Sequence, residues 1–129
     1  MKYRVKQKRN GINDKQLYYA ETVWSGLVGT REIAKVIAQR STVSVGDVLA
    51  TLYGLVQAME QYLHDGYSVK LDDLGVFRLS ATSAGYETPE ECTPHRVKVA
   101  KLCFRADPQI KSNLKFVKFE RDKKENTDK

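Results

Sequence analysis

A chain of 129 residues, of which 41% are hydrophobic and 29% charged, has the size and composition of one globular domain or one domain with appendages. A multidomain enzyme and a wholly disordered chain are excluded on these grounds. The net charge of +6 at pH 7 leaves a polyanionic partner as an open class of function.

The sequence predicts neither a membrane span nor a secretion signal. Its longest uncharged apolar stretch, residues 48–59, is shorter than the roughly 20 residues that a spanning helix needs. Glu21 interrupts the one early segment that could form the core of a signal peptide, so we expect a cytoplasmic protein. Cys92 and Cys103 lack the spacing of a metal or redox motif, and we expect reduced thiols.

The positive charge is segregated along the chain. Residues 1–31 carry seven Lys/Arg and two acidic residues, a net +5, whereas residues 32–95 carry four and nine, a net −5. Residues 96–110 then carry +3, and residues 111–129 another +3. This segregation is typical of a chain that binds a polyanion, and without an amphipathic anchor nucleic acid is a commoner partner than a membrane. Solvated basic termini would give the same counts.

A basic N-terminal extension with β structure is predicted over residues 1–29. Residues 1–10 alternate Lys and Arg with other side chains, which is the period of a half-exposed strand. Asn10-Gly11 predicts a turn, and residues 17–23, rich in Tyr, Thr and Val, predict a second strand that could pair with the first.

Two helices are predicted next. Apolar residues recur at helical spacing over residues 30–40, and Ser44, with Asp47 three residues later, predicts the cap of a second helix. Gly66 predicts its end in a left-handed conformation. The apolar stripe of residues 45–63 is wide for a single partner helix, so burial against a second subunit is as natural as burial within one chain.

Strands dominate the rest of the chain. In the first long strand, alternation places Arg78, Ser80 and Thr82 on one face. The predicted elements, in chain order, are a strand at residues 69–71, a strand at residues 75–82, a loop or flexible hairpin tip at residues 83–95, a return strand at residues 97–105, a short helix at residues 108–114, an alternating segment at residues 115–121 and a disordered tail at residues 122–129.

Two stretches resemble the bacterial histone-like HU/IHF family of DNA-bending proteins. The opening helix pair, glycine turn and strand of that family are similar to TREIAKVIAQRSTVSVGDVLATLYGLVQAMEQYLHDGYSVKLDDLGVF, which ends in Gly75-Val76-Phe77. The return strand and last helix are similar to KLCFRADPQIKSNLK. The resemblance covers about 90 residues and identifies residues 30–121 as an HU/IHF-like domain.

The resemblance implies an α+β fold: an intertwined dimer with a helix pair, a three-stranded antiparallel sheet, a long β-ribbon arm and a short C-terminal helix, here with extra N-terminal strands. It implies a non-catalytic, nucleoid-associated architectural protein that binds and bends double-stranded DNA through its minor groove. The partners implied are DNA and a second copy or a related HU-like subunit. Neither a cofactor, a metal, a membrane nor a small-molecule substrate is implied.

The chain departs from the family at the arm tip. A typical tip carries Arg-Asn-Pro-x-Thr-Gly, whereas residues 83–95 contain three glutamates and no Lys or Arg. The glutamates are Glu87, Glu90 and Glu91. Because acidic groups repel phosphates, we predict a poor minor-groove wedge, although Pro89 or Pro94 could still take the intercalating role. The chain therefore resembles a divergent, N-terminally extended branch of the family.

Cations on both sides of this tip are the candidate DNA contacts. Arg78, Lys101 and Arg105 share strand parity and are expected on one face of the ribbon, where they could neutralise phosphates or simply be solvated. Arg96 and Lys98 are expected at the base of the arm, on the opposite parity.

The resemblance adds a basic contact at Arg105 and a phosphate-contacting lysine at Lys111. The predicted DNA-binding residues are Arg78, Ser80, Thr82, Arg96, Lys98, Lys101, Arg105 and Lys111.

Two further groups leave alternatives open. The N-terminal cations could lie along DNA or guard the edge of a strand. These cations are Lys2, Arg4, Lys6, Lys8 and Arg9. Tyr18, Tyr19 and Trp24 could stack on the bases of a single strand, but packing into a core is favoured.

We predict no catalytic residues. His64, His95 and the pair Asp72-Asp73 stand in no nucleophile motif, phosphate loop or metal spacing. An architectural DNA-binding dimer is the favoured hypothesis. A dimerisation module that has lost DNA binding, which the acidic tip allows, and an RNA or single-strand binder are the alternatives.

Overall fold

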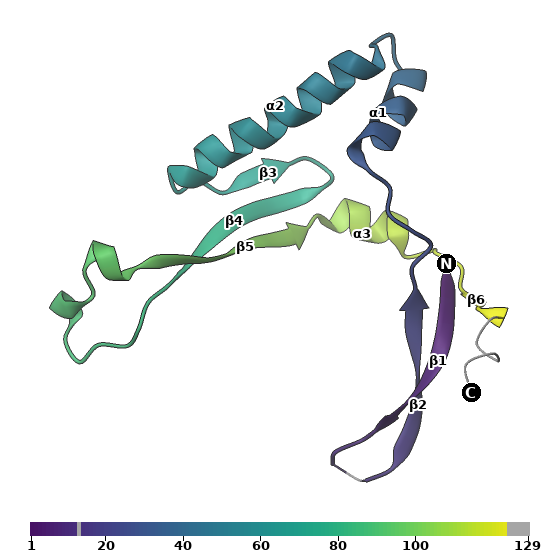
Figure 1. Ribbon diagram of the computed structural model, residues 1–129, viewed down its shortest axis with the longest axis horizontal. Coiled ribbons are helices and arrows are strands. Elements are labelled where there is room, and N and C mark those ends of the chain that lie inside the picture. Colours follow the sequence, from purple (N-terminus) through teal and green to yellow (C-terminus); the bar gives the residue numbers. More distant parts are fainter. Residues whose placement is uncertain (13, 124–129) are drawn as a thin grey trace. The chain divides into compact units, whose positions relative to one another are not determined.

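The computed structural model describes residues 1–12 and 14–123, and these form an α+β protein (Figure 1). The elements in chain order are β1 (Lys2–Arg9), β2 (Gln16–Val23), α1 (Thr30–Gln39), α2 (Val45–His64), β3 (Val69–Leu71), β4 (Gly75–Thr82), the 3₁₀ turns η1 (Pro89–Glu91) and η2 (Pro94–Arg96), β5 (Lys98–Ala106), α3 (Pro108–Leu114) and β6 (Glu120–Arg121).

The chain divides into two compact units. The first comprises Met1–Gly29 with the C-terminal segment from Lys115, and the second comprises Thr30–Leu114. Residues 115–121, predicted as part of the DNA-binding domain, belong to the first unit, and the division into functional domains stays a prediction. Most of the predicted disordered tail, residues 124–129, lies outside the described residues.

The first unit is a three-stranded sheet in the order β2-β1-β6. The predicted hairpin is confirmed: β1 pairs antiparallel with β2 over its whole length, and Asn10 N–H donates to the carbonyl of Lys15 at 2.9 Å to close the turn. Strand β6 adds a parallel pairing with β1, in which Lys2 lies opposite Glu120. This pairing of the two ends of the chain was not predicted.

Helices α1 and α2 open the second unit. The predicted cap of α2 is confirmed, because the Ser44 hydroxyl accepts a hydrogen bond from Asp47 N–H at 3.2 Å. Gly66 follows α2 with a φ of +87°, the left-handed conformation expected at a helix end. Ala34, Val48 and Leu63 are the only hydrophobic side chains that are buried among the described residues.

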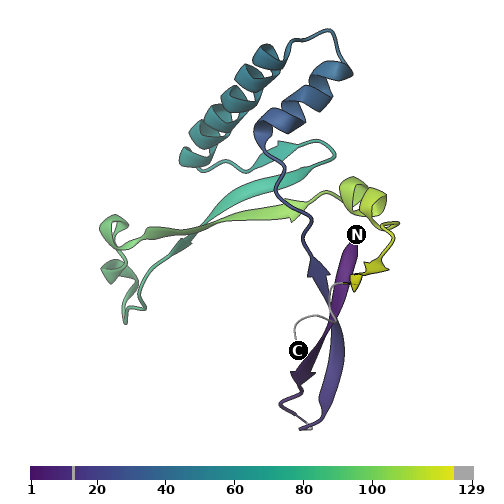
Figure 2. The same cartoon turned by 45° about the vertical axis from the view of Figure 1, so that its right-hand side comes forward.

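The predicted three-stranded antiparallel sheet, in the order β3-β4-β5, completes the second unit. The long β4–β5 pair extends away from α1 and α2 as an arm, as both views show (Figures 1 and 2). At its base, Phe77 and Phe104 stack with ring centroids 4.8 Å apart. Asp107 then caps the predicted short helix α3, since its Oδ1 accepts a hydrogen bond from Gln109 N–H at 2.9 Å. Within the described residues, no helix is long and apolar enough to cross a membrane.

Candidate nucleic-acid interface

The register of the β4–β5 arm decides which cations share a face. Residues directly opposite one another in an antiparallel pair project to the same side. The opposing pairs are Val76 with Arg105, Arg78 with Cys103, and Ser80 with Lys101. The predicted shared face of Arg78, Lys101 and Arg105 is therefore confirmed, while DNA contact by these residues stays a prediction.

A β-bulge changes the position expected for Lys98. Ser80 pairs with Lys101 but Ala81 pairs with Val99, so Ala100 is an extra residue in β5. Beyond the bulge Lys98 lies opposite Thr82, which alternates in phase with Ser80, and it therefore joins the face of the other cations. The predicted opposite parity of Lys98 is wrong, because simple alternation does not count the extra residue.

The predicted place of Lys98 at the base of the arm is also wrong. Its partner Thr82 is the last residue of β4, at the end remote from Gly75 and Ala106, which pair at the base. Lys98 thus lies at the end of the strand pair next to the tip.

Lys70 is a further cation of this face that was not among the predicted site residues. It lies opposite Val76 on β3, and Val76 lies opposite Arg105 on β5, so Lys70 and Arg105 flank the same β4 residue on one face. Lys70 lies within the strand predicted at residues 69–71, but its membership of this face depends on the pairing of all three strands.

These residues form a surface that we name the cationic ribbon face. Its cations are Lys70, Arg78, Lys98, Lys101 and Arg105. All five side chains are exposed, the strand pairs place no acidic residue among them, and in the described part of the chain none makes an ion pair. The uncharged members of the face include Ser80 and Thr82, the two hydroxyl residues predicted as DNA contacts. The face therefore offers positive charge and hydrogen-bond donors, which suit phosphate oxygens.

An open depression lies in the cationic ribbon face between the two arginines. It has a volume of about 270 Å³ and is lined by Ser68, Val76, Arg78, Cys103, Phe104 and Arg105. The guanidinium groups of Arg78 and Arg105 can present forked donors there to an anion such as a phosphate group.

The arm tip is built differently from the rest of the ribbon. Residues 83–95, predicted as a loop or flexible tip, contain the 3₁₀ turn η1 and most of η2. The Arg96 guanidinium lies 5.0 Å from the centre of the Tyr86 ring and donates to the carbonyl of Glu91 at 2.9 Å. Arg96 thus holds the tip together, outside the strand register of the cationic ribbon face, and its predicted place at the base of the arm is wrong.

Three other predicted features occupy separate positions. Lys111 is exposed on α3 and is not part of the ribbon pairing. The preferred packing of the aromatic residues of the extension into a core is wrong: Tyr18 is 69%, Tyr19 43% and Trp24 84% exposed. The described residues contain no cluster of His, Cys, Asp or Glu that could hold a metal ion.

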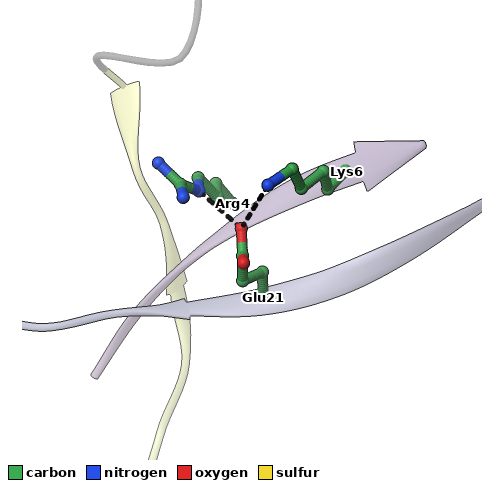
Figure 3. A network of polar contacts seen from close by, with 3 residues as sticks. All are labelled: Arg4, Lys6 and Glu21. Atoms are coloured by element: carbon green, nitrogen blue, oxygen red, sulfur yellow. Dashed lines mark hydrogen bonds and ion pairs between the residues drawn. The ribbon is translucent and has the colours of Figure 1, made fainter. Parts of the chain in front are cut away.

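The N-terminal cations lie on the sheet of the first unit. Arg4 Nε lies 2.8 Å from Glu21 Oε2, and this hydrogen bond is the main cause that lowers the pKa of Glu21 (Figure 3). Lys6 Nζ lies 3.8 Å from the same oxygen, and Arg9 pairs with Asp14 at 2.6 Å. Arg4 and Lys6 thus converge on a single carboxylate.

Comparisons with known proteins agree on the fold. A family model, HU-HIG, described as an HU domain fused to wHTH, Ig, or glycine-rich motif, matches residues 1–121. Among solved structures, one from Bacteroides vulgatus ATCC 8482, described as a candidate bacterial DNA-binding protein, aligns with a TM-score of 0.63 at 10% identity. The alignment covers 93% of this chain but 47% of that protein, so the chain spans about half its length.

Anabaena HU, solved as a cocrystal with DNA, aligns with a TM-score of 0.52 at 14% identity, over 70% of this chain and 100% of that one. No curated protein matches the sequence. The HU-like resemblance and fold predicted from the sequence are confirmed.

Proposed function

We propose, from the fact that this chain belongs to the HU-HIG family of HU domains fused to wHTH, Ig or glycine-rich motifs, that it is a non-catalytic architectural protein that binds duplex DNA. The observation that carries the proposal is the cationic ribbon face, where five cations occur without a carboxylate. The candidate DNA-binding protein from Bacteroides vulgatus and the cocrystal of Anabaena HU with DNA support DNA as the partner. The proposed location is the bacterial nucleoid, in the cytoplasm.

Under this proposal, contacts with phosphates supply most of the DNA affinity. Each phosphate that a cation neutralises releases counterions, and log affinity falls with log salt by about 0.9 for each contact. Five contacts from one ribbon would give a slope of roughly −4 to −5 per chain. Because none of the five cations pairs with an acid of residues 1–12 or 14–123, none must break such an ion pair before it contacts DNA.

A dimer is part of the proposal. Among the described residues, burial of Val48 and Leu63 contributes about 1.5 to 3 kcal/mol each and burial of Ala34 less. This gain is small beside the roughly 1 to 2 kcal/mol lost for every residue that is ordered. Apolar side chains meanwhile remain uncovered on the helices and on the apolar face of the arm: Val56 is 52%, Leu102 56% and Phe104 51% exposed. A second copy or a related HU-like subunit would cover them.

The acidic tip favours contact through the flanks of the arm over insertion of a proline. The tip glutamates, Glu87, Glu90 and Glu91, are all exposed. Changing all three to Gln should strengthen DNA binding, because it removes repulsion of phosphates, whereas Pro89→Ala should alter bending little. A Pro89→Ala protein that no longer bends DNA would show that the tip inserts after all.

The same acidic tip is the observation that favours the second candidate, a dimerisation module with weak or lost DNA binding. The exposed Tyr18 and Trp24 are what an RNA or single-strand binder would use. Gel shifts over a range of salt concentrations, with straight duplex, nicked or bent duplex and single-stranded RNA, separate the three functions. The proposal requires duplex binding that weakens steeply with salt.

A matched pair of variants then locates the binding. Arg78→Gln/Arg105→Gln removes two charges from the cationic ribbon face and should reduce the salt slope by about 2 per chain. Arg31→Gln/Arg40→Gln removes two exposed charges at the ends of α1 and should leave most of the slope intact. Equal effects of the two variants would reject the ribbon face as the main contact.

A further inference from the structure

Strand β1 carries a second concentration of positive charge, in the first unit. Alternate residues of a strand project to one face, about 6.8 Å apart, so the even-numbered cations of β1 form a row. This N-terminal cationic face consists of Lys2, Arg4, Lys6 and Lys8. We propose that it is a second DNA-binding surface that contacts the phosphate backbone, an inference that rests on the proposed function for the identity of the polyanion.

The paired strands neutralise only part of the charge on this face. The β2 residues opposite the row are Val23, Glu21, Tyr19 and Leu17, and the β6 residue opposite Lys2 is Glu120. Four cations therefore face two carboxylates within the three strands, and Asp122, which follows β6 in phase with Glu120, is a third acidic residue next to them. Within the described residues, neither Lys2 nor Lys8 lies within 4.0 Å of a carboxylate.

The contacts of Glu21 leave positive charge in excess. Its Oε2 lies 2.8 Å from Arg4 Nε and 3.8 Å from Lys6 Nζ (Figure 3). One carboxylate carries one negative charge, so it cannot neutralise both cations. The shorter contact engages Arg4 through Nε, and the ammonium group of Lys6 sits at the limit of an ion pair, where it remains available to a phosphate.

Protection of a strand edge does not account for the start of the row. Lysines guard a sheet when they lie on a strand whose hydrogen-bonding groups are open to other chains. At Lys2 and Tyr3, β1 is the central strand, with β2 on one side and β6 on the other. The N–H of Asp122 also donates to the carbonyl of Tyr3 at 2.8 Å, so this end of β1 needs no guard.

The chemistry of the face fits a nucleic-acid backbone. The amide side chains that could read bases, Gln7 and Gln16, lie on the opposite face of the hairpin and bond to each other at 2.5 Å. A row of cations without neighbouring amide side chains favours contacts with phosphates, which carry no sequence information. A two-stranded ribbon also has the width that the major groove of B-DNA admits, so duplex DNA is the partner to which the proposal commits.

The test measures the salt slope of the full chain on a random-sequence duplex by fluorescence anisotropy. Lys2→Gln/Lys6→Gln/Lys8→Gln should reduce the slope by about 2 to 3 per chain, whereas Arg at the same three positions should preserve it. Lys6→Gln/Gln7→Lys keeps the composition and net charge but moves one cation to the opposite face, and it should still reduce the slope by about 0.9. If the triple Gln variant melts at a lower temperature than the wild type by circular dichroism, only the relocation variant, Lys6→Gln/Gln7→Lys, is used to test the proposal.

Several outcomes would overturn the inference. An unchanged slope in the triple Gln variant, or a wild-type slope in the relocation variant, would show that this face does not touch DNA. A loss of slope on single-stranded RNA alone would reject duplex DNA as the partner. The ribbon variant Arg78→Gln/Arg105→Gln, measured alongside, separates this inference from the proposed function: a loss only in the ribbon variant rejects the N-terminal face, and a loss only in the N-terminal variant rejects the ribbon.

Discussion

Among the glycines of the described residues, Gly75 is the one whose change to Ala should cost the most stability. Gly75 is buried at the base of the arm with a φ of +153°, a conformation that residues with a side chain rarely adopt. A Cβ atom added there would lie 2.6 Å from Cε2 of Phe104 and would also press on the backbone carbonyl of Arg105. The carbonyl cannot withdraw without disturbing the β4–β5 pairing.

The size of the effect follows from these two contributions. A strained backbone conformation costs about 1 to 3 kcal/mol. Overpacking of the tight contact costs about another 1 to 3 kcal/mol. The sum, about 2 to 6 kcal/mol, is a large part of the 5 to 15 kcal/mol that typical domains possess. For a unit of this size the melting temperature should fall by at least about 10 °C.

The assay is thermal unfolding followed by circular dichroism at a fixed protein concentration, because a dimer melts in a concentration-dependent way. Gly46→Ala is the matched control: Gly46 is exposed in the first turn of α2, and the nearest atom to its added Cβ is Ser44 Oγ at 4.0 Å. The control should melt as the wild type or slightly higher, since Ala favours helix. Equal melting temperatures for Gly75→Ala and Gly46→Ala would refute the close packing at the base of the arm.

Three further predictions concern binding, assembly and pH. Arg105→Ala/Lys111→Ala should reduce the slope of log affinity against log salt for duplex binding by about 1 to 2 per subunit, with little dependence on DNA sequence. A wild-type slope in filter binding would contradict the proposal that the flanks of the arm contact DNA. Leu52→Asp should leave no folded species, because an unpaired charge in the expected helix interface costs several kcal/mol, and a stable wild-type monomer at micromolar concentration in sedimentation would contradict the dimer. Arg4 lowers the pKa of Glu21 in the folded state. The pair therefore stabilises the fold at pH values above the ordinary glutamate pKa, and this stabilisation is lost as the pH falls through the lowered pKa. The wild type should therefore melt above Glu21→Gln at neutral pH and converge with it in acid, and a difference in melting temperature that is independent of pH would reject this linkage.

Much of the local structure was predictable from the sequence because its causes lie within a few residues. The alternation of β1 and β2 and the turn at Asn10-Gly11 predicted the hairpin that the structure contains. Ser44 predicted the start of α2, since an N-cap hydroxyl bonds an amide only three residues away. The shared face of Arg78 and Lys101 was predictable for the same reason, because no irregularity interrupts either strand between these residues and the base of the arm.

Tertiary structure decided the features that depend on which segments meet. The extra residue Ala100 brings Lys98 onto the cationic ribbon face, and no alternation pattern reveals a bulge before the two strands are in register. Lys70 joins that face through a third strand. Strand β6 pairs with β1 although the paired residues, such as Lys2 and Glu120, are far apart in the sequence. Arg96 engages Tyr86 instead of the ribbon. Periodicity reports how one segment divides its side chains between two faces, but register and long-range pairing are set by the partner segment, whose identity only the folded chain reveals.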